Sequence, residues 1–118
     1  MMNQRLVTHE QRKALVAIGR KRVSDQHVDP QSVVRLFAPD AGASWLLASL
    51  DPGDQDTAYG LCDVGVGLPE LGHVKLSELA SIVGPRGRPI LRDRYFRPMR
   101  PRVNMPAWRR QAVPSLID

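Results

Sequence analysis

Arginine is the residue type in this sequence with the clearest capacity for chemistry. Residues 81–118 contain nine arginines and no lysine, against the two acids Asp93 and Asp118. A guanidinium group is planar and donates paired hydrogen bonds that match the oxygens of phosphates and carboxylates. Aromatic residues lie among these arginines and offer faces on which nucleobases or a protein partner could stack. The residues predicted to bind nucleic acid or another partner are Arg86, Arg88, Arg92, Arg94, Arg97, Arg100, Arg102, Trp108, Arg109 and Arg110.

Carboxylates are concentrated in the middle of the chain, where residues 41–80 contain six acids and the single base Lys75. Hard cations such as Mg²⁺ prefer oxygen ligands, so the carboxylates from Asp51 to Asp63 suggest an alternative function, a metal-assisted hydrolase. However, their spacing matches no twelve-residue calcium loop, and Asp-Pro-Gly-Asp is a common turn sequence. We therefore predict no metal site and interpret five residues as an acidic strip that binds a partner: Asp51, Asp54, Asp56, Asp63 and Glu70.

The other residue types give little support to catalysis. His9, His27 and His73 are scattered, and none has a histidine or cysteine at metal-ligand spacing. Cys62 lies in an apolar segment, where a cysteine is usually a buried packing residue. Residues 65–70 begin like a dinucleotide-binding motif, but Glu70 stands where that motif requires its third glycine. We predict no catalytic residue and no cofactor, and therefore a non-enzymatic protein.

The composition excludes several classes of protein. With 42% apolar and 25% charged residues, the chain is typical of a folded domain rather than of a disordered one. Its apolar runs are far shorter than the ~18 residues that a transmembrane helix needs. One cysteine permits no internal disulfide, and the first residues lack the apolar core of a signal peptide. We expect a cytoplasmic protein that does not associate with membranes.

The net charge of +5 is divided unevenly along the chain. Residues 1–40 contain seven basic and four acidic residues, a net charge of +3. Residues 41–80 contain one basic and six acidic residues (−5), and residues 81–118 contain nine basic and two acidic residues (+7). Opposite charges within one small protein attract each other. Two alternatives therefore stay open: the arginines bind an outside partner, or several of them fold back onto the acidic strip.

The spacing of apolar and turn-forming residues predicts one compact α+β domain over residues 1–96 and a proline- and arginine-rich arm over residues 97–118. Thr8 and Gln11 have the spacing of a capping box, which predicts a helix from there to about residue 21. This helix is expected to pack on an antiparallel sheet of four to five strands. The core is predicted to contain Leu15, Leu36, Trp45, Leu47, Leu61, Val64 and Leu79.

Three segments rich in β-branched, aromatic or other apolar residues, each followed by a turn sequence, predict a meander of strands over 32–37, 45–50 and 57–66. A glycine-rich loop through residue 72 is expected to follow the third strand. The predicted later elements are a brief strand over 73–75, a short helix over 77–82 capped by Ser77, a turn over 84–87 and a half-exposed strand over 90–96.

The chain also resembles a known family. The similarity is carried mainly by Gly60-Leu61-Cys62-Asp63 and Pro69-Glu70-Leu71-Gly72. Shorter matching segments are Thr8-His9-Glu10-Gln11-Arg12, Val34-Arg35-Leu36-Phe37, Trp45-Leu46-Leu47, Leu50-Asp51-Pro52 and Leu76-Ser77-Glu78-Leu79. Over about residues 6–96 the chain is similar to the bacterial family known as domain of unknown function 2958.

This resemblance implies a biological context rather than a mechanism. Proteins of the family look like passengers of plasmids, integrative elements and phages, and small proteins of that origin often act against host defence as antirestriction or anti-CRISPR factors. No catalytic residue carries over from the family. Together with the charges, the resemblance suggests a binding protein that acts on nucleic acid or on a host nucleoprotein complex through its arginines and its acidic strip.

Overall fold

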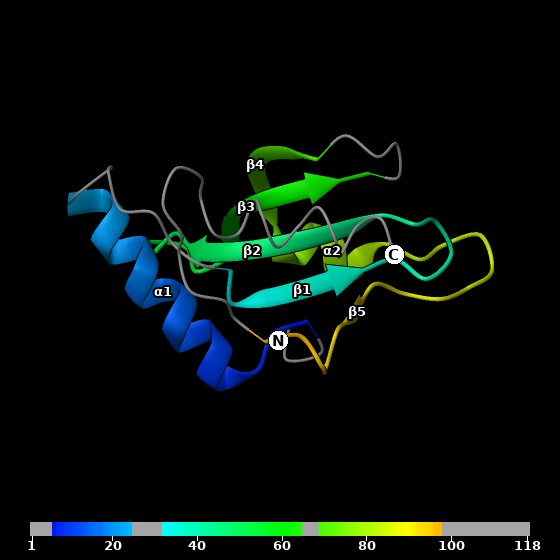
Figure 1. The fold of residues 1–118 in the computed structure, drawn as a ribbon, viewed down its shortest axis with the longest axis horizontal. Coiled ribbons are helices and arrows are strands. Elements are labelled where there is room, and N and C mark those ends of the chain that lie inside the picture. Colours follow the sequence, from blue (N-terminus) through cyan, green and yellow to red (C-terminus); the bar gives the residue numbers. More distant parts are fainter. Residues whose placement is uncertain (1–5, 25–31, 65–68, 98–118) are drawn as a thin grey trace.

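The structure, a computed structural model, describes residues 6–24, 32–64 and 69–97 of the 118-residue chain. The elements follow the order α1 (His9–Ser24), β1 (Val34–Phe37), β2 (Ser44–Leu50), β3 (Thr57–Asp63), β4 (Glu70–Lys75), α2 (Leu76–Ser81) and β5 (Leu91–Arg92). The strands form one antiparallel sheet in the order β4-β3-β2-β1-β5 (Figure 1). The predicted α+β fold is therefore confirmed, with an N-terminal helix, a five-stranded sheet and a short second helix.

Helix α1 begins with the capping box that the sequence predicts. The N–H of Gln11 donates to the Thr8 hydroxyl oxygen at 3.0 Å, and the N–H of Thr8 donates to the Gln11 side-chain oxygen at 2.9 Å. These bonds satisfy backbone groups that the first turn of a helix leaves without partners. The helix continues to Ser24, beyond the predicted end at residue 21. Neither helix in the described part of the chain is long and apolar enough to cross a bilayer.

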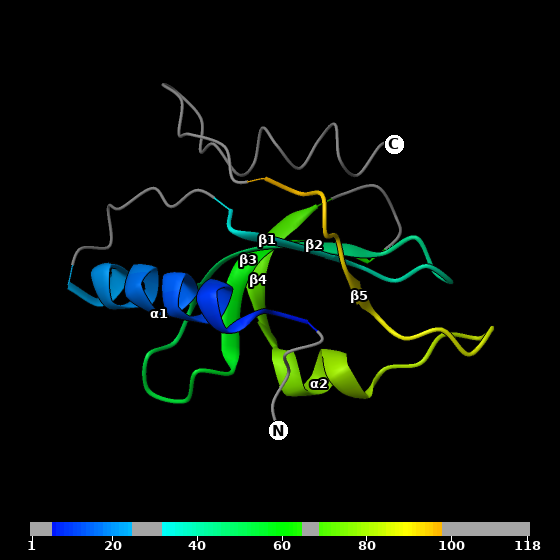
Figure 2. The same ribbon diagram turned by 90° about the horizontal axis from the view of Figure 1, so that it is seen from below.

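Both helices cover the same face of the sheet, and the main hydrophobic core lies between them and the strands (Figure 2). Removing apolar side chains from water in this way is the main driving force of folding. Five of the residues predicted for the core belong to it: Leu15, Leu36, Trp45, Leu47 and Leu79.

The opposite face of the sheet has a smaller apolar cluster. Leu46 and Leu61 are buried there, and the half-buried Phe96 packs against them. Leu61 is thus buried as predicted. The prediction for Val64 is wrong, because β3 ends at Asp63 instead of reaching residue 66, and the Val64 side chain is left 69% exposed.

The later elements differ from their predicted bounds. Strand β4 includes Gly72, which was expected in a loop but pairs with Gly60 of β3. Helix α2 begins one residue early, its N-cap is Lys75, and no side chain caps it from that position, so Ser77 is not the cap residue. The last strand contains two residues instead of seven. The pairing of Gly72 depends on a distant segment, which local sequence patterns do not contain.

Strand β2 lies at the centre of the sheet, and all seven of its residues are buried. Two glycines allow neighbouring elements to approach its backbone. A Cβ atom on Gly60 would overlap the carbonyl oxygen of Leu46, and one on Gly19 would overlap the carbonyl oxygen of Leu50. These positions therefore exclude any side chain, and Gly19 fixes how closely α1 packs on the end of β2.

We predict that Gly60→Ala destabilises the fold by about 1–3 kcal/mol, because the new methyl group meets backbone atoms of β2 that cannot move freely. Gly72→Ala is the matched control, since Gly72 is the strand partner of Gly60 and a Cβ atom there meets nothing within 4 Å. Its effect should stay within about 0.5 kcal/mol. Urea denaturation of the three proteins measures both values, and equal losses in the two variants would contradict the close approach at Gly60.

Candidate functional site

The predicted arginines within the described residues lie at the β5 end of the sheet. Strand β5 pairs with β1 and is the last strand in the order. We call residues 84–97 the arginine edge; it contains Arg86, Arg88, Arg92, Arg94 and Arg97 and the single acid Asp93. Five other predicted binding residues, Arg100, Arg102, Trp108, Arg109 and Arg110, lie outside the described residues.

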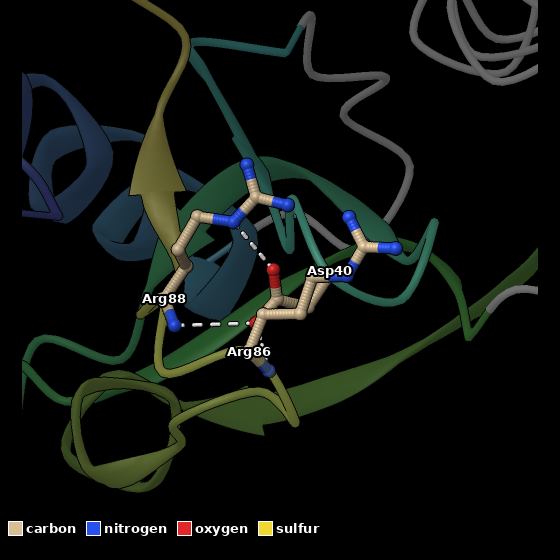
Figure 3. Close-up of polar contacts among 3 residues, drawn as sticks. All are labelled: Asp40, Arg86 and Arg88. Atoms are coloured by element: carbon tan, nitrogen blue, oxygen red, sulfur yellow. Dashed lines mark hydrogen bonds and ion pairs between the residues drawn. The ribbon is translucent and has the colours of Figure 1, made fainter.

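Asp40 holds the first part of the arginine edge (Figure 3). Its Oδ2 accepts the N–H of Arg86 at 2.9 Å and the N–H of Arg88 at 3.2 Å, and its Oδ1 accepts the Arg88 Nε–H at 2.5 Å. Gly84 lies so close that a Cβ atom there would come within 2.5 Å of the Asp40 side chain. One carboxylate that follows β1 therefore organises a turn that belongs to a distant part of the chain.

The ion pair between Asp40 and Arg88 is asymmetric in its exposure. The Asp40 side chain is 1% exposed, whereas the Arg88 side chain is 50% exposed. Burial acts to raise the pKa of Asp40, but the hydrogen bonds from Arg88 and Arg86 and the charge of Arg88 outweigh it, so the pKa lies below its ordinary value of 3.8. Asp40 is therefore ionised at neutral pH and balances the charge of Arg88 within the fold.

Asp93 anchors the second part of the arginine edge to β1. Its Oδ2 accepts a hydrogen bond from Arg35 Nη1 at 3.2 Å, and its N–H donates to the Arg35 carbonyl oxygen at 2.8 Å. Its Oδ1 accepts the N–H of Tyr95 at 2.9 Å. The next residue, Phe96, packs inward on the smaller apolar cluster, while the Tyr95 side chain is 91% exposed. The backbone is thus fastened on both sides of an aromatic ring that faces water.

Three cations of the arginine edge are left without an acidic partner among the described residues. Arg86, Arg94 and Arg97 are exposed, and only the backbone N–H of Arg86 is used by Asp40. Arg92 differs from them because it is half-buried within β5. The side chains available for contact with a partner are therefore Arg86, Arg94, Tyr95 and Arg97.

The first three residues of the predicted acidic strip lie in the turn between β2 and β3, where Asp54 is the central acceptor. Its Oδ1 accepts the N–H groups of Asp56 and Thr57 at 2.8 and 2.9 Å, and its Oδ2 accepts the Thr57 hydroxyl at 2.7 Å. Asp51 Oδ2 in turn accepts the N–H of Asp54 at 3.3 Å. The hydrogen bonds from Thr57 and Asp56 lower the pKa of Asp54 from 3.8 to about 2.

Asp56 links this turn to helix α2. Its two carboxylate oxygens accept the N–H and the hydroxyl of Ser77 at 2.9 and 2.6 Å, and its carbonyl oxygen accepts the N–H of Leu76 at 2.9 Å. A carboxylate at this end of a helix satisfies free N–H groups and interacts favourably with the helix dipole. Asp56 therefore stabilises the start of α2, the role that the sequence suggested for Ser77.

The structure does not bring the five acidic residues together. Asp63 lies at the opposite end of β3 from the turn, is 3% exposed and pairs with Ser44, whereas Glu70 is exposed on β4. The length of β3 separates Asp63 from the acids of the β2–β3 turn by about 20 Å. Across the described residues, no three His, Cys, Asp or Glu side chains are grouped so that they could hold a metal ion. Asp51 and Asp63 therefore do not converge on one site.

The ion pairs of the described residues bear on the two alternatives for the arginines. Arg88 pairs with Asp40 and Arg35 pairs with Asp93, and neither acid belongs to the acidic strip. The strip residues of the β2–β3 turn accept hydrogen bonds from that turn and from α2 instead. The ion pairs with Asp40 and Arg35 therefore fasten residues 84–97 through residues that lie outside the strip.

A second group of polar side chains was not singled out from the sequence. Arg22, Ser49, Tyr59 and His73 line one hollow beside the end of α1. They come from four different elements, and no local motif connects them. Only the register of β2, β3 and β4 could have revealed that three of them lie side by side.

The pKa of Asp54 predicts how stability depends on pH. Because its pKa is depressed in the folded state, the Asp54 carboxylate stabilises the fold above pH about 4, and this contribution is lost as the pH falls through about 2. The difference in free energy of unfolding between the wild type and Asp54→Ala should therefore shrink between pH 4 and 2. Glu70→Ala removes an exposed carboxylate and serves as the control. Urea titrations across this range test the expectation, and a difference that stays constant down to pH 2 would refute it.

Comparison with known proteins places this fold in a family. Neither the curated proteins nor the solved structures gave a match to the chain. One family model does match, described as protein of unknown function (DUF2958), and it covers residues 6–113. The match spans all the described elements and extends past the arginine edge. Since it covers most of the chain, the resemblance seen in the sequence is confirmed, and the protein belongs to the DUF2958 family.

Proposed function

We propose that this protein binds nucleic acid through the arginine edge and does so without catalysing a reaction. The observation that carries the proposal is the Tyr95 side chain, which is 91% exposed and lies between the exposed residues Arg94 and Arg97. An aromatic ring that stacks on bases, combined with arginines that contact phosphates, is the common arrangement for binding unpaired strands. The preferred ligand is therefore single-stranded DNA or RNA.

The fastening of this segment supports the proposal. Asp93 bonds to Arg35 of β1 and to the N–H of Tyr95, and Phe96 packs on the sheet, so the Tyr95 backbone is held before any ligand arrives. A segment whose backbone is already fixed loses less conformational entropy when it binds. Tyr95 would otherwise be an unusual residue to expose so completely, because tyrosine is buried to an intermediate degree in most folded proteins.

The charges give further support. Phosphate binding by arginine supplies sequence-independent affinity, because each neutralised phosphate releases bound counterions. Arg86 extends the cationic surface from the turn held by Asp40. The carboxylates of Asp51, Asp54 and Asp56 accept hydrogen bonds in the turn between β2 and β3, whereas the arginine edge lies on the β5 side of the sheet.

The resemblance to proteins of mobile elements extends the proposal to a biological role. A cytoplasmic protein that binds unpaired strands could occupy the nucleic acid of a host defence complex, as an antirestriction or anti-CRISPR factor does. The target would then be the nucleoprotein complex, with the arginine edge in contact with its strand.

Fluorescence anisotropy with a labelled single strand and with the matching duplex tests the proposal. Tyr95→Ala should weaken binding of the single strand about ten-fold, in line with the ~1–3 kcal/mol of a base–aromatic stack, and affect the duplex less. Arg94→Ala should lower the slope of log K against log salt by about one.

Arg20→Ala is the matched control, because it removes one exposed positive charge from α1, away from the arginine edge. It should change the affinity of the single strand only slightly. The proposal fails if no DNA or RNA binds at low salt. It also fails if Tyr95→Ala binds the single strand as tightly as Arg20→Ala.

A further inference from the structure

A hollow of about 620 Å³ opens between the last turn of α1 and the ends of β2, β3 and β4. It is separate from the arginine edge, which lies on the β5 side of the sheet. Its polar lining includes Arg22, Ser49, Asp51, Tyr59 and His73. Cavities that bind small molecules commonly have volumes of about 300–1,000 Å³, so this hollow has room for an organic ligand rather than for a small ion alone.

Arg22 is held in a defined position within the hollow. Its guanidinium carbon lies 3.7 Å from the centre of the Tyr59 ring, and its Nη1 donates to the Ser49 hydroxyl oxygen at 3.2 Å. Ser49 is 2% exposed. No carboxylate within the described part of the chain pairs with Arg22. The side chain is therefore an oriented cation, and no acid of residues 6–24, 32–64 or 69–97 engages its remaining N–H groups.

The strand register places the other polar side chains beside Arg22. Ser49, Tyr59 and His73 are consecutive partners across β2, β3 and β4, and the ring centres of Tyr59 and His73 are 5.0 Å apart. A bulge between Leu47 and Ser49 shifts this register. Without it, Ala48 would face Tyr59, and the hydroxyl that positions Arg22 would lie elsewhere. Bulges often re-aim a side chain at a binding site in this way.

The charges of the lining restrict the kind of ligand. An oriented guanidinium group matches a phosphate through paired hydrogen bonds. Asp51 also lines the hollow, so a second anionic group would be repelled, whereas an amino group of the ligand would find an acceptor. The exposed His73 ring adds an aromatic surface. One phosphate, amino groups and a flat ring occur together in a nucleotide.

We propose that this hollow binds a nucleoside monophosphate, with its phosphate on Arg22 and its base towards His73 and Asp51. The site has its own residues and does not depend on the arginine edge. The same chemistry is present in a free mononucleotide and in the 5′-phosphorylated end of a strand. The two sources are distinguished by comparing adenosine and cytidine monophosphates with a 5′-phosphorylated oligonucleotide of the same base.

NMR titration of the ¹⁵N-labelled full chain tests the site and reports folding at the same time. The monophosphates should shift the signals of Ser49, Tyr59 and His73, and Arg22→Ala should weaken binding at least ten-fold. Arg22→Lys keeps the charge but loses the paired geometry, and should bind with intermediate affinity. Arg20→Ala, two residues earlier in α1, should bind the monophosphates as the wild type does.

Two results would overturn the inference. One is the absence of shifts at these residues with either monophosphate or with the phosphorylated oligonucleotide. The other is equal binding of adenosine and adenosine monophosphate, since the phosphate would then not contact Arg22. Tighter binding of the oligonucleotide than of the mononucleotide, with the same loss in Arg22→Ala, supports the site and identifies a strand end as its ligand.

Discussion

The fold depends on the complete burial of strand β2. Its seven residues are covered on both faces and paired on both edges, by β1 and by β3. Two neighbouring elements approach its backbone so closely that a side chain has no room, at Gly19 of α1 and at Gly60 of β3. These contacts set the distance of the helix and the register of the sheet. The bulge near Ser49 lies within this strand, and Arg22 donates a hydrogen bond to the Ser49 hydroxyl oxygen.

Several carboxylates in the described part of the chain act as hydrogen-bond acceptors for the backbone. Asp40, Asp54 and Asp93 each accept at least one backbone N–H from a nearby or distant turn, and Asp56 accepts one at the start of α2. Charged acceptors make stronger hydrogen bonds than neutral ones, which suits short turns with few other contacts. The consequence is electrostatic as well as structural, because these acids hold the turns while several arginines keep their charge at the surface.

The parts of the fold that could be predicted from the sequence are those that nearby residues determine. Thr8 and Gln11 satisfy each other within one helical turn, and Asp51-Pro52-Gly53-Asp54 turns the chain by local hydrogen bonds, so both are visible in the sequence. The prediction that arginines would gather near one end needed only a count of charges.

The remaining features depend on contacts between distant residues. Gly72 becomes part of a strand because Gly60 pairs with it, and Ser77 bonds to Asp56, which lies 21 positions earlier in the chain. The hollow beside Arg22 requires both the register and the bulge of β2, which no spacing in the sequence encodes. Asp40 is the clearest case, because nothing near it in the sequence suggests a partner at Arg88.

The hydrogen bonds that Asp40 accepts also affect the stage of folding at which the arginine edge forms. Asp40 precedes Arg86 by 46 positions and Arg88 by 48 positions. Closing such a long loop has an entropic cost, which must be met before these contacts can stabilise the fold. The hairpin of β1 and β2 has local contacts and can form earlier, which leaves the turn at residues 84–88 as a late step of folding. Late-forming, partly exposed segments are also the first to open by local unfolding. Under destabilising conditions the turn at residues 84–88 would therefore open before the buried Ile90 and the half-buried Phe96 of the same segment leave their apolar clusters.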